Sequence, residues 1–173
     1  MKQDNNQEMF PIVDEQGNII NAATRGEGHN GSRLLHPVVH LHVFNSQGEI
    51  YLQKRPEWKD IQPGKWDTAV GGHVSYGESI LEAVYREASE ELGFTEFHPI
   101  HIETYEFESS IEREMVSVFA AIGSYDLHPD LDEVDEGRWW DIADVDAAMG
   151  KDILTPNFES EFKMIRHSLL ALL

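Results

Sequence analysis

Residues 71–94, GGHVSYGESILEAVYREASEELGF, carry the clearest structural signals in this 173-residue chain. Ser79, followed three residues later by Glu82, fits a helix-capping box, in which each side chain accepts a hydrogen bond from the other residue's backbone N–H. Gly93 fits the left-handed residue that often follows the last turn of a helix. The pattern predicts a helix of about 13 residues between these two signals.

The predicted helix carries an apolar arc and an acidic arc. At about 100° per residue, the apolar arc holds Leu81, Val84, Ala88 and Leu92. The neighbouring arc holds Glu87, Glu90 and Glu91. These like charges repel each other, and their place near the helix C-terminus is unfavourable for anions. Carboxylates at this spacing can surround a hard divalent cation such as Mg²⁺, and the plain alternative is a solvated acidic face.

The rest of the chain shows alternating strand and helix patterns without repeats or a linker, which predicts one domain over residues 1–173. Turn signals between short apolar runs predict strands at 9–13, 19–22, 37–44, 49–53, 69–70, 97–107, 114–122 and 137–141. Helices are expected at 145–149 and 158–172. The order of these elements indicates a β-sheet between helices, with residues 1–30 as an N-terminal hairpin arm.

The composition restricts the compartment and the partners. A formal net charge of −19 argues against nucleic acid or an anionic membrane as a partner. No stretch is long and apolar enough to span a membrane, and the polar N-terminus does not fit a secretory signal, so the cytoplasm is the expected compartment. The absence of cysteine leaves His, Asp, Glu and backbone oxygens as metal ligands.

One stretch of the acidic chain is locally basic. Residues 33–65 hold five basic and three acidic side chains, a local sum of +2. The basic residues are Arg33, Lys54, Arg55, Lys59 and Lys65. An anionic substrate could be received there, although ordinary solvated side chains on a hairpin and loop explain the same count.

Residues 71–94 resemble the complete Nudix box, in the strand–loop–helix context that this motif requires. Five residues separate its first glycine from its first glutamate, and seven more precede the Arg-Glu pair. Every fixed position is filled: Gly72, Glu78, Arg86, Glu87, Ala88, Glu90, Glu91, Gly93 and Phe94. The resemblance implies the Nudix fold, an α/β (α+β) architecture with a mixed β-sheet sandwiched between helices.

The Nudix resemblance also implies hydrolysis of a phosphoric anhydride with Mg²⁺ or Mn²⁺. The implied metal ligands are three carboxylates, one of which would help to activate water, and a backbone carbonyl: Glu87, Glu90, Glu91 and Gly72. Arg86 and Glu78 would orient the catalytic carboxylates. Metal ions in such a site neutralise the diphosphate oxygens and lower the pKa of the attacking water. The expected partner is therefore a small-molecule diphosphate.

Within that family, residues from about 12 to 144 resemble the branch containing type I isopentenyl diphosphate isomerase and related hydrolases. Short matches lie at 13–15, 33–36, 132–134 and 140–144. The isomerase binds a second divalent metal, and the matching residues here are His29, His36, His73, Glu112 and Glu114. The implied ion is Zn²⁺ or Mn²⁺. Histidines are plentiful in this chain, however, and the two glutamates also fit the outer face of an exposed strand.

Two further positions bear on the resemblance to the isomerase. Its diphosphate-binding basic residues map to Arg25, Arg55 and Lys59. Gly71 stands where the isomerase has the cysteine that exchanges protons with the alkene, and glycine cannot do that chemistry. The intact Nudix box and the missing cysteine together favour a hydrolase over an isomerase.

Three functions therefore stay open at the level of sequence. They are a diphosphatase for a nucleoside-diphosphate-linked or isoprenoid-type substrate, an isomerase-like enzyme without cysteine, and a non-catalytic binding module. The loops at 58–66 and 108–113 would contact the non-phosphate half of a substrate but carry no motif. Four tryptophans could stack on a base, although core positions are more usual for them: Trp58, Trp66, Trp139 and Trp140. The N-terminal arm leaves a homodimer open.

Overall fold

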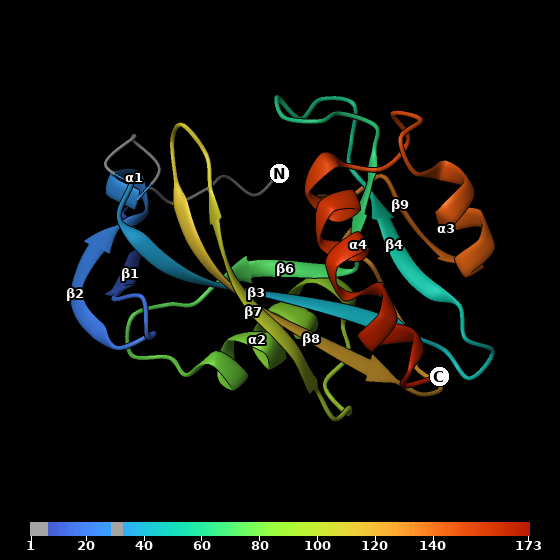
Figure 1. The fold of residues 1–173 in the computed structure, drawn as a ribbon, viewed down its shortest axis with the longest axis horizontal. Helices are drawn as coiled ribbons and strands as arrows, with labels where there is room; N and C mark the ends of the chain where they lie inside the picture. The colour runs from blue at the N-terminus through green and yellow to red at the C-terminus, as the bar shows by residue number, and fades with distance from the viewer. Residues whose placement is uncertain (1–6, 29–32) are drawn as a thin grey trace.

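A seven-stranded mixed sheet lies at the centre of the computed structural model, which describes residues 7–28 and 33–173 (Figure 1). Its strands are β3 (Leu35–Phe44), β4 (Ile50–Lys54), β5 (Trp66–Thr68), β6 (Val70–His73), β7 (Ile100–Glu108), β8 (Arg113–Ile122) and β9 (Glu136–Trp140). The order is β5-β4-β3-β8-β7, with β6 paired to β3 and β9 to β4. β3 runs parallel to β8 and antiparallel to β6, so the sheet is mixed as predicted.

An N-terminal hairpin lies at one end of the sheet (Figure 1). It consists of β1 (Met9–Val13) and β2 (Ile19–Thr24), followed by the short helix α1 (Arg25–Gly28). Asp14 closes the turn, because its Oδ1 accepts hydrogen bonds from the backbone N–H groups of Gln16 and Asn18, both at 2.9 Å. The predicted hairpin is confirmed, whereas α1 was not predicted.

Helices cover both faces of the sheet (Figure 1). α2 (Ile80–Leu92) covers one face, and α3 (Ile142–Ala148) with α4 (Pro156–Leu170) covers the other. The side chains of β3 alternate between the two cores: Val39, Leu41 and Val43 pack toward α2, and Phe44 packs toward α4. Each such buried side chain contributes about 1.5–3 kcal/mol. Among the described residues, no helix is long and apolar enough to cross a membrane.

Both predicted ends of α2 are confirmed. The Ser79 hydroxyl accepts from the Glu82 N–H at 3.1 Å, and the Glu82 carboxylate accepts from the Ser79 N–H at 3.3 Å. Gly93 follows the helix in the left-handed region, with φ of 66°. Leu81 was placed wrongly on the packed arc: it is 49 % exposed, whereas Ile80 and Ala83 of the same turn pack against the core.

The remaining predicted elements are present with shifted ends. The strand expected from residue 97 begins at Ile100, because Phe97 packs against Phe94 instead, with ring centroids 4.5 Å apart. The helix expected at 145–149 begins earlier, at Ile142, since Asp141 is its N-terminal flanking residue.

Candidate active site

The buried face of α2 includes two carboxylates. The Glu87 side chain is only 14 % exposed and Glu91 is half-buried, whereas the Glu90 side chain is 49 % exposed. At 100° per residue, Glu91 falls between Glu87 and Val84, on the side that faces the sheet. The acidic and apolar arcs of α2 therefore overlap. If the glutamates only formed a solvated acidic face, Glu87, Glu90 and Glu91 would all be exposed, but of the three only Glu90 is.

The glycine pair at β6 brings backbone against these carboxylates. A Cβ atom at Gly72 would lie 2.1 Å from the carboxyl carbon of Glu87, so a side chain there would displace this carboxylate. The Gly71 N–H donates a hydrogen bond to Glu91 Oε2 at 3.1 Å. Gly72, Glu87 and Glu91 are thus in immediate proximity, although they come from a strand and a helix.

Arg86 binds the acidic residues of the box to each other. Its Nε and Nη2 donate to the two oxygens of Glu78 at 2.7 and 2.9 Å, a bidentate pair. Nη1 donates to Glu87 at 2.9 Å and to Glu90 at 3.3 Å. Nη2 also donates to the backbone carbonyl of His73 at 3.0 Å. One guanidinium therefore fixes α2, the loop before it and β6.

Burial changes the protonation of the carboxylates. It raises the pKa of Glu87 to about 7, against the opposing effect of Arg86. Burial and the neighbouring Glu87 charge raise the pKa of Glu91 well above its usual range. Burial acts the same way on Glu78, but hydrogen bonds from Arg86 outweigh it and leave that pKa below its usual value. The bidentate pair with Arg86 thus lowers the pKa of Glu78, whereas the single Arg86 contact at Glu87 does not outweigh burial.

A pocket of about 200 Å³ opens beside Glu91, and we name it the Glu91 pocket. Its lining residues come from β3, β4, β5, β6, α2, α4 and the connecting loops: His40, Gln53, Arg55, Pro56, Lys59, Asp67, Thr68, Gly71, Glu91, Glu133, Val134 and Asn157. Arg55 and Lys59, two of the predicted diphosphate-binding residues, are both in this set. Lys59 Nζ is 3.6 Å from Glu133, and Arg55 Nη1 is 3.8 Å from Asp67.

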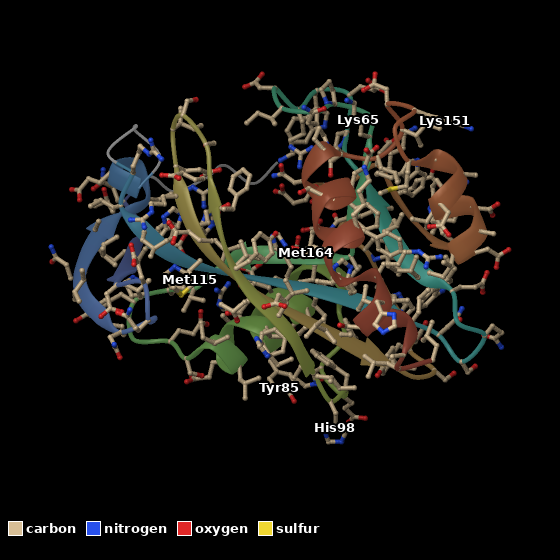
Figure 2. All side chains as sticks on the ribbon, viewed as in Figure 1. Lys65, Tyr85, His98, Met115, Lys151 and Met164 are labelled. Atoms are coloured by element: carbon tan, nitrogen blue, oxygen red, sulfur yellow. The ribbon has the colours of Figure 1, made fainter. Side chains whose placement is uncertain are left out.

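The other residues of the basic stretch lie in ion pairs elsewhere. Lys54 pairs with Asp135, and Arg33 pairs with Glu108. Lys65 lies beside the turn after α3, where Lys151 is labelled (Figure 2), and it pairs with Asp152.

Part of the predicted second metal site comes together. His36, His73 and Glu114 each offer a ligand atom, and these atoms all lie within 4.8 Å of one another; we name them the His/Glu cluster. Both histidine Nε2 atoms are 3.8 Å from Glu114 Oε2. Burial and the charge of Glu112 raise the pKa of Glu114 to about 7. His29 lies outside the described residues.

The two histidines of the cluster have different neighbours at Nδ1. His36 Nδ1 is 3.0 Å from the Leu34 carbonyl, which leaves Nε2 as the lone-pair nitrogen toward Glu114. His73 Nδ1 is 3.2 Å from Arg25 Nη1, a permanent donor, so the ring proton belongs on Nε2. Arg25 is therefore at the His/Glu cluster, apart from Arg55 and Lys59.

A buried network that the sequence did not reveal lies between β3 and α4. Glu161, which is 2 % exposed, is 2.7 Å from His40 Nδ1, from His42 Nε2 and from the Tyr105 hydroxyl. Burial alone would raise the pKa of Glu161, but His40 and the hydrogen bonds outweigh it and leave that pKa far below its usual range. The alternation of His40 and His42 was the visible signal, and their partner is 119 residues from His42.

The tryptophans divide between core and surface. Trp66 and Trp140 are buried and meet edge to face, with ring centroids 5.3 Å apart. Trp139 packs against Tyr51 at 5.1 Å, and Trp58 is 51 % exposed. Trp66 and Trp140 are therefore core residues, as is more usual for tryptophan, rather than residues free to stack on a base.

Comparison with known proteins agrees with this geometry. The family model described as the NUDIX domain matches residues 34–158. A Yersinia pestis protein named as an uncharacterized Nudix hydrolase is 37 % identical over 134 residues, which cover 76 % of this chain and 72 % of the relative. The chain belongs to the Nudix family, and with it to the hydrolases that act on phosphoric anhydrides.

Further comparisons define the branch and the fold. A protein of Clavibacter sepedonicus named isopentenyl-diphosphate Delta-isomerase is 31 % identical over 140 residues, covering 78 % of this chain and 74 % of the relative. A Deinococcus radiodurans crystal structure shares the fold with a TM-score of 0.75 at 20 % identity, covering 91 % of this chain and 99 % of that one. A MutT protein structure from Methanosarcina mazei gives a TM-score of 0.66 at 27 % identity, covering 79 % and 96 %. The Nudix fold and the isomerase-containing branch are confirmed.

Proposed function

We propose that this protein is a Mg²⁺-dependent hydrolase that cleaves the phosphoanhydride bond of a nucleoside-diphosphate-linked or related organic diphosphate. The observation that carries the proposal is the pair of partly buried carboxylates with raised pKa values, Glu87 and Glu91, next to a pocket that also contains Arg55 and Lys59. Carboxylates with raised pKa values gain most from a bound cation. The net charge of −19 supports a small-molecule substrate over nucleic acid, and the cytoplasm stays the expected compartment.

The donor set fits a hard divalent cation. Glu87, Glu90, Glu91 and the Gly72 carbonyl would hold Mg²⁺ or Mn²⁺, since the missing Cβ of Gly72 leaves the Glu87 carboxylate directly against the backbone. When bound, the ion neutralises diphosphate oxygens and lowers the pKa of a water molecule. Arg86 and Glu78 hold Glu87 and Glu90 in place through the contacts described above.

The basic residues have separate proposed roles. Arg55 and Lys59 bind the phosphate oxygens in the Glu91 pocket through charge-assisted hydrogen bonds. Arg25 contacts the diphosphate only if the substrate extends to the His/Glu cluster, where Arg25 lies beside His73.

A second candidate is an isomerase-like reaction on an isoprenoid diphosphate. The His/Glu cluster favours it, because His36, His73 and Glu114 suit a divalent ion such as Zn²⁺ or Mn²⁺, with Glu112 close by. Gly71 opposes it, since that position provides no proton-exchanging side chain.

The test is phosphate release from nucleotide sugars, dinucleoside polyphosphates, nucleoside triphosphates, coenzyme-type diphosphates and isopentenyl diphosphate, with Mg²⁺ and with chelator. We expect metal-dependent cleavage that falls by about 10³-fold in Glu91→Gln, within the range for losing a general base or its equivalent. Glu136→Gln, at an exposed glutamate of β9, is the control and should retain activity.

Failure of the wild type on every compound would refute the hydrolase. An alkene-isomerisation assay with isopentenyl diphosphate then decides between the isomerase-like enzyme and a binding module.

A further inference from the structure

His40 and His42, the two histidines of β3 that bind Glu161, have different surroundings at the ring edge that faces away from Glu161. His42 is fully buried, and within the described residues its Nδ1 has no hydrogen-bond partner. The His40 side chain is 23 % exposed and lines the Glu91 pocket. His42 therefore contacts only the interior of the protein, whereas His40 contacts Glu161 on one side and the Glu91 pocket on the other.

Gly71 leaves the edge of the His40 ring uncovered. The two residues are register partners in the β3–β6 pair. A Cβ atom at Gly71 would lie 3.3 Å from His40 Cδ2 and 3.7 Å from Nε2, so glycine lets the β6 backbone lie close to this edge of the imidazole with no side chain over it. The N–H of the same glycine donates to Glu91. His40 and the catalytic carboxylate are thus separated by a single backbone position.

Glu161 determines which nitrogen of His40 is available. Nδ1 is engaged with Glu161 Oε1 at 2.7 Å, so Nε2 is the nitrogen at the open edge. Burial alone would lower the pKa of His40, but Glu161 raises it to about 9. At neutral pH the ring is therefore cationic, and its Nε2–H is a charge-assisted donor.

The size and charges of the Glu91 pocket fit a phosphate group. Its volume of about 200 Å³ is below the roughly 300–1,000 Å³ typical of sites for whole drug-sized ligands, so the pocket suits the diphosphate rather than the entire substrate. Arg55 and Lys59 come from the loop that follows β4, and His40 comes from the central strand β3. The three cations line the same pocket from different elements.

We propose that His40 binds the substrate in the Glu91 pocket, donating a hydrogen bond from Nε2, beside Gly71, to a phosphate oxygen of the diphosphate, while Glu161 holds the ring at Nδ1. This inference rests on the proposed hydrolase function and adds a residue outside the Nudix box. His40 contacts the substrate, and Glu161 acts through His40 as a positioning residue. Arg55 and Lys59 bind the other phosphate oxygens.

The test compares His40→Asn with His42→Gln. Asparagine places an amide donor near the Nδ1 position of His40 and keeps the bond to Glu161, but it has no group at Nε2. Glutamine at position 42 keeps a donor near the Nε2 position that contacts Glu161. We expect kcat/KM to fall about tenfold to a hundredfold in His40→Asn, as for a lost hydrogen bond to a charged group, and to stay near wild type in His42→Gln.

Binding is measured separately, with methylene bisphosphonate as a diphosphate probe that is not hydrolysed. In Mg²⁺, its Kd should rise about tenfold or more in His40→Asn and little in His42→Gln. In ¹⁵N-histidine-labelled wild type, the Nε2 signal of His40 should shift on adding the probe, and that of His42 should not.

The outcomes separate the two proposals. Equal loss in both histidine variants, or an unshifted His40 signal with bound probe, overturns the role of His40. Metal-dependent cleavage lost in Glu91→Gln would keep the hydrolase even then. If the wild type cleaves nothing, the hydrolase fails, and equal bisphosphonate affinity in wild type and His40→Asn overturns this inference too.

Discussion

Glu91 on α2, which is half-buried, and Glu161 on α4, which is buried, lie on opposite sides of the same sheet, and their pKa values shift in opposite directions. Burial and the nearby Glu87 raise the pKa of Glu91, whereas the donors around Glu161 lower its pKa in spite of burial. Glu161 has three side-chain partners at 2.7 Å. Glu91 accepts one backbone hydrogen bond from Gly71 at 3.1 Å.

The difference shows how the protein distributes its charge. The charge of Glu161 is compensated by partners within the fold, so this residue can stabilise the packing of α4 on the sheet and orient His40. Glu91 accepts hydrogen bonds from neutral donors, the Gly71 N–H and the Gln53 side chain, and its pKa stays raised beside a pocket, which is typical of residues that bind a metal or act in catalysis. Burial raises the pKa of both residues, and the direction of the shift is decided by their partners: the histidines at Glu161 and the Glu87 charge at Glu91.

The largest expected effect is on stability. Glu161→Gln should lower the free energy of unfolding by about 3 kcal/mol, because one partner of a buried charged network is removed. Glu91→Gln should leave the metal-free protein as stable as wild type or more so, since it removes a buried charge that is poorly compensated. Denaturant unfolding at pH 7 with chelator measures both, and equal losses would contradict the contrast.

A somewhat smaller effect is expected at Gly72. Gly72→Ala should lower kcat/KM about a hundredfold, because the added Cβ displaces the Glu87 carboxylate by an ångström or more. The fold should be retained, since the clash is with the end of a side chain. Circular dichroism and steady-state kinetics check this together, and a fully active variant would show that the position of Glu87 is not critical.

The smallest effect concerns pH. The raised pKa of His40, about 9 against a usual 6.5, stabilises the fold below about 6.5, and this contribution is lost as pH rises through 9. The lowered pKa of Glu161 stabilises the fold above its usual 4.5, and that contribution is lost as pH falls. The difference in unfolding free energy between wild type and Glu161→Gln should therefore be greatest between pH 4.5 and 6.5.

By pH 9.5 that difference should have fallen by about 1–2 kcal/mol. Unfolding of both proteins across the pH range measures it. A difference that does not change with pH would mean that His40 and Glu161 are not coupled.

Local signals in the sequence were enough to predict α2 and the presence of its carboxylates. Ser79 and Glu82 cap the first turn of α2 and Gly93 follows its last turn. Each acts on the turn next to it, so these roles could be predicted from spacing alone. The wrong placement of Leu81 shows the limit, because periodicity does not say which side chains of a turn the rest of the fold covers. The burial of Glu87 and Glu91 depends on β6, which the helix pattern cannot describe.

Long-range partners escaped prediction for the same reason. His40 and His42 are conspicuous on β3, but Glu161 is on the last helix, and no spacing rule connects them. Arg25 was grouped with Arg55 and Lys59, whereas the path of α1 brings it to His73. Pairings of this kind depend on topology rather than on periodicity.

The parallel pairing of β3 with β8 also has a consequence for the order of folding. Residues 35–44 must align with residues 113–122, so a long loop closes before this central pair can form. The β7–β8 hairpin is local, and α2 carries its own caps, so both can form early. We expect the Glu91 pocket to form among the last features, since it needs β3, β6, α2 and α4 together, and a partly folded chain would not yet bind substrate.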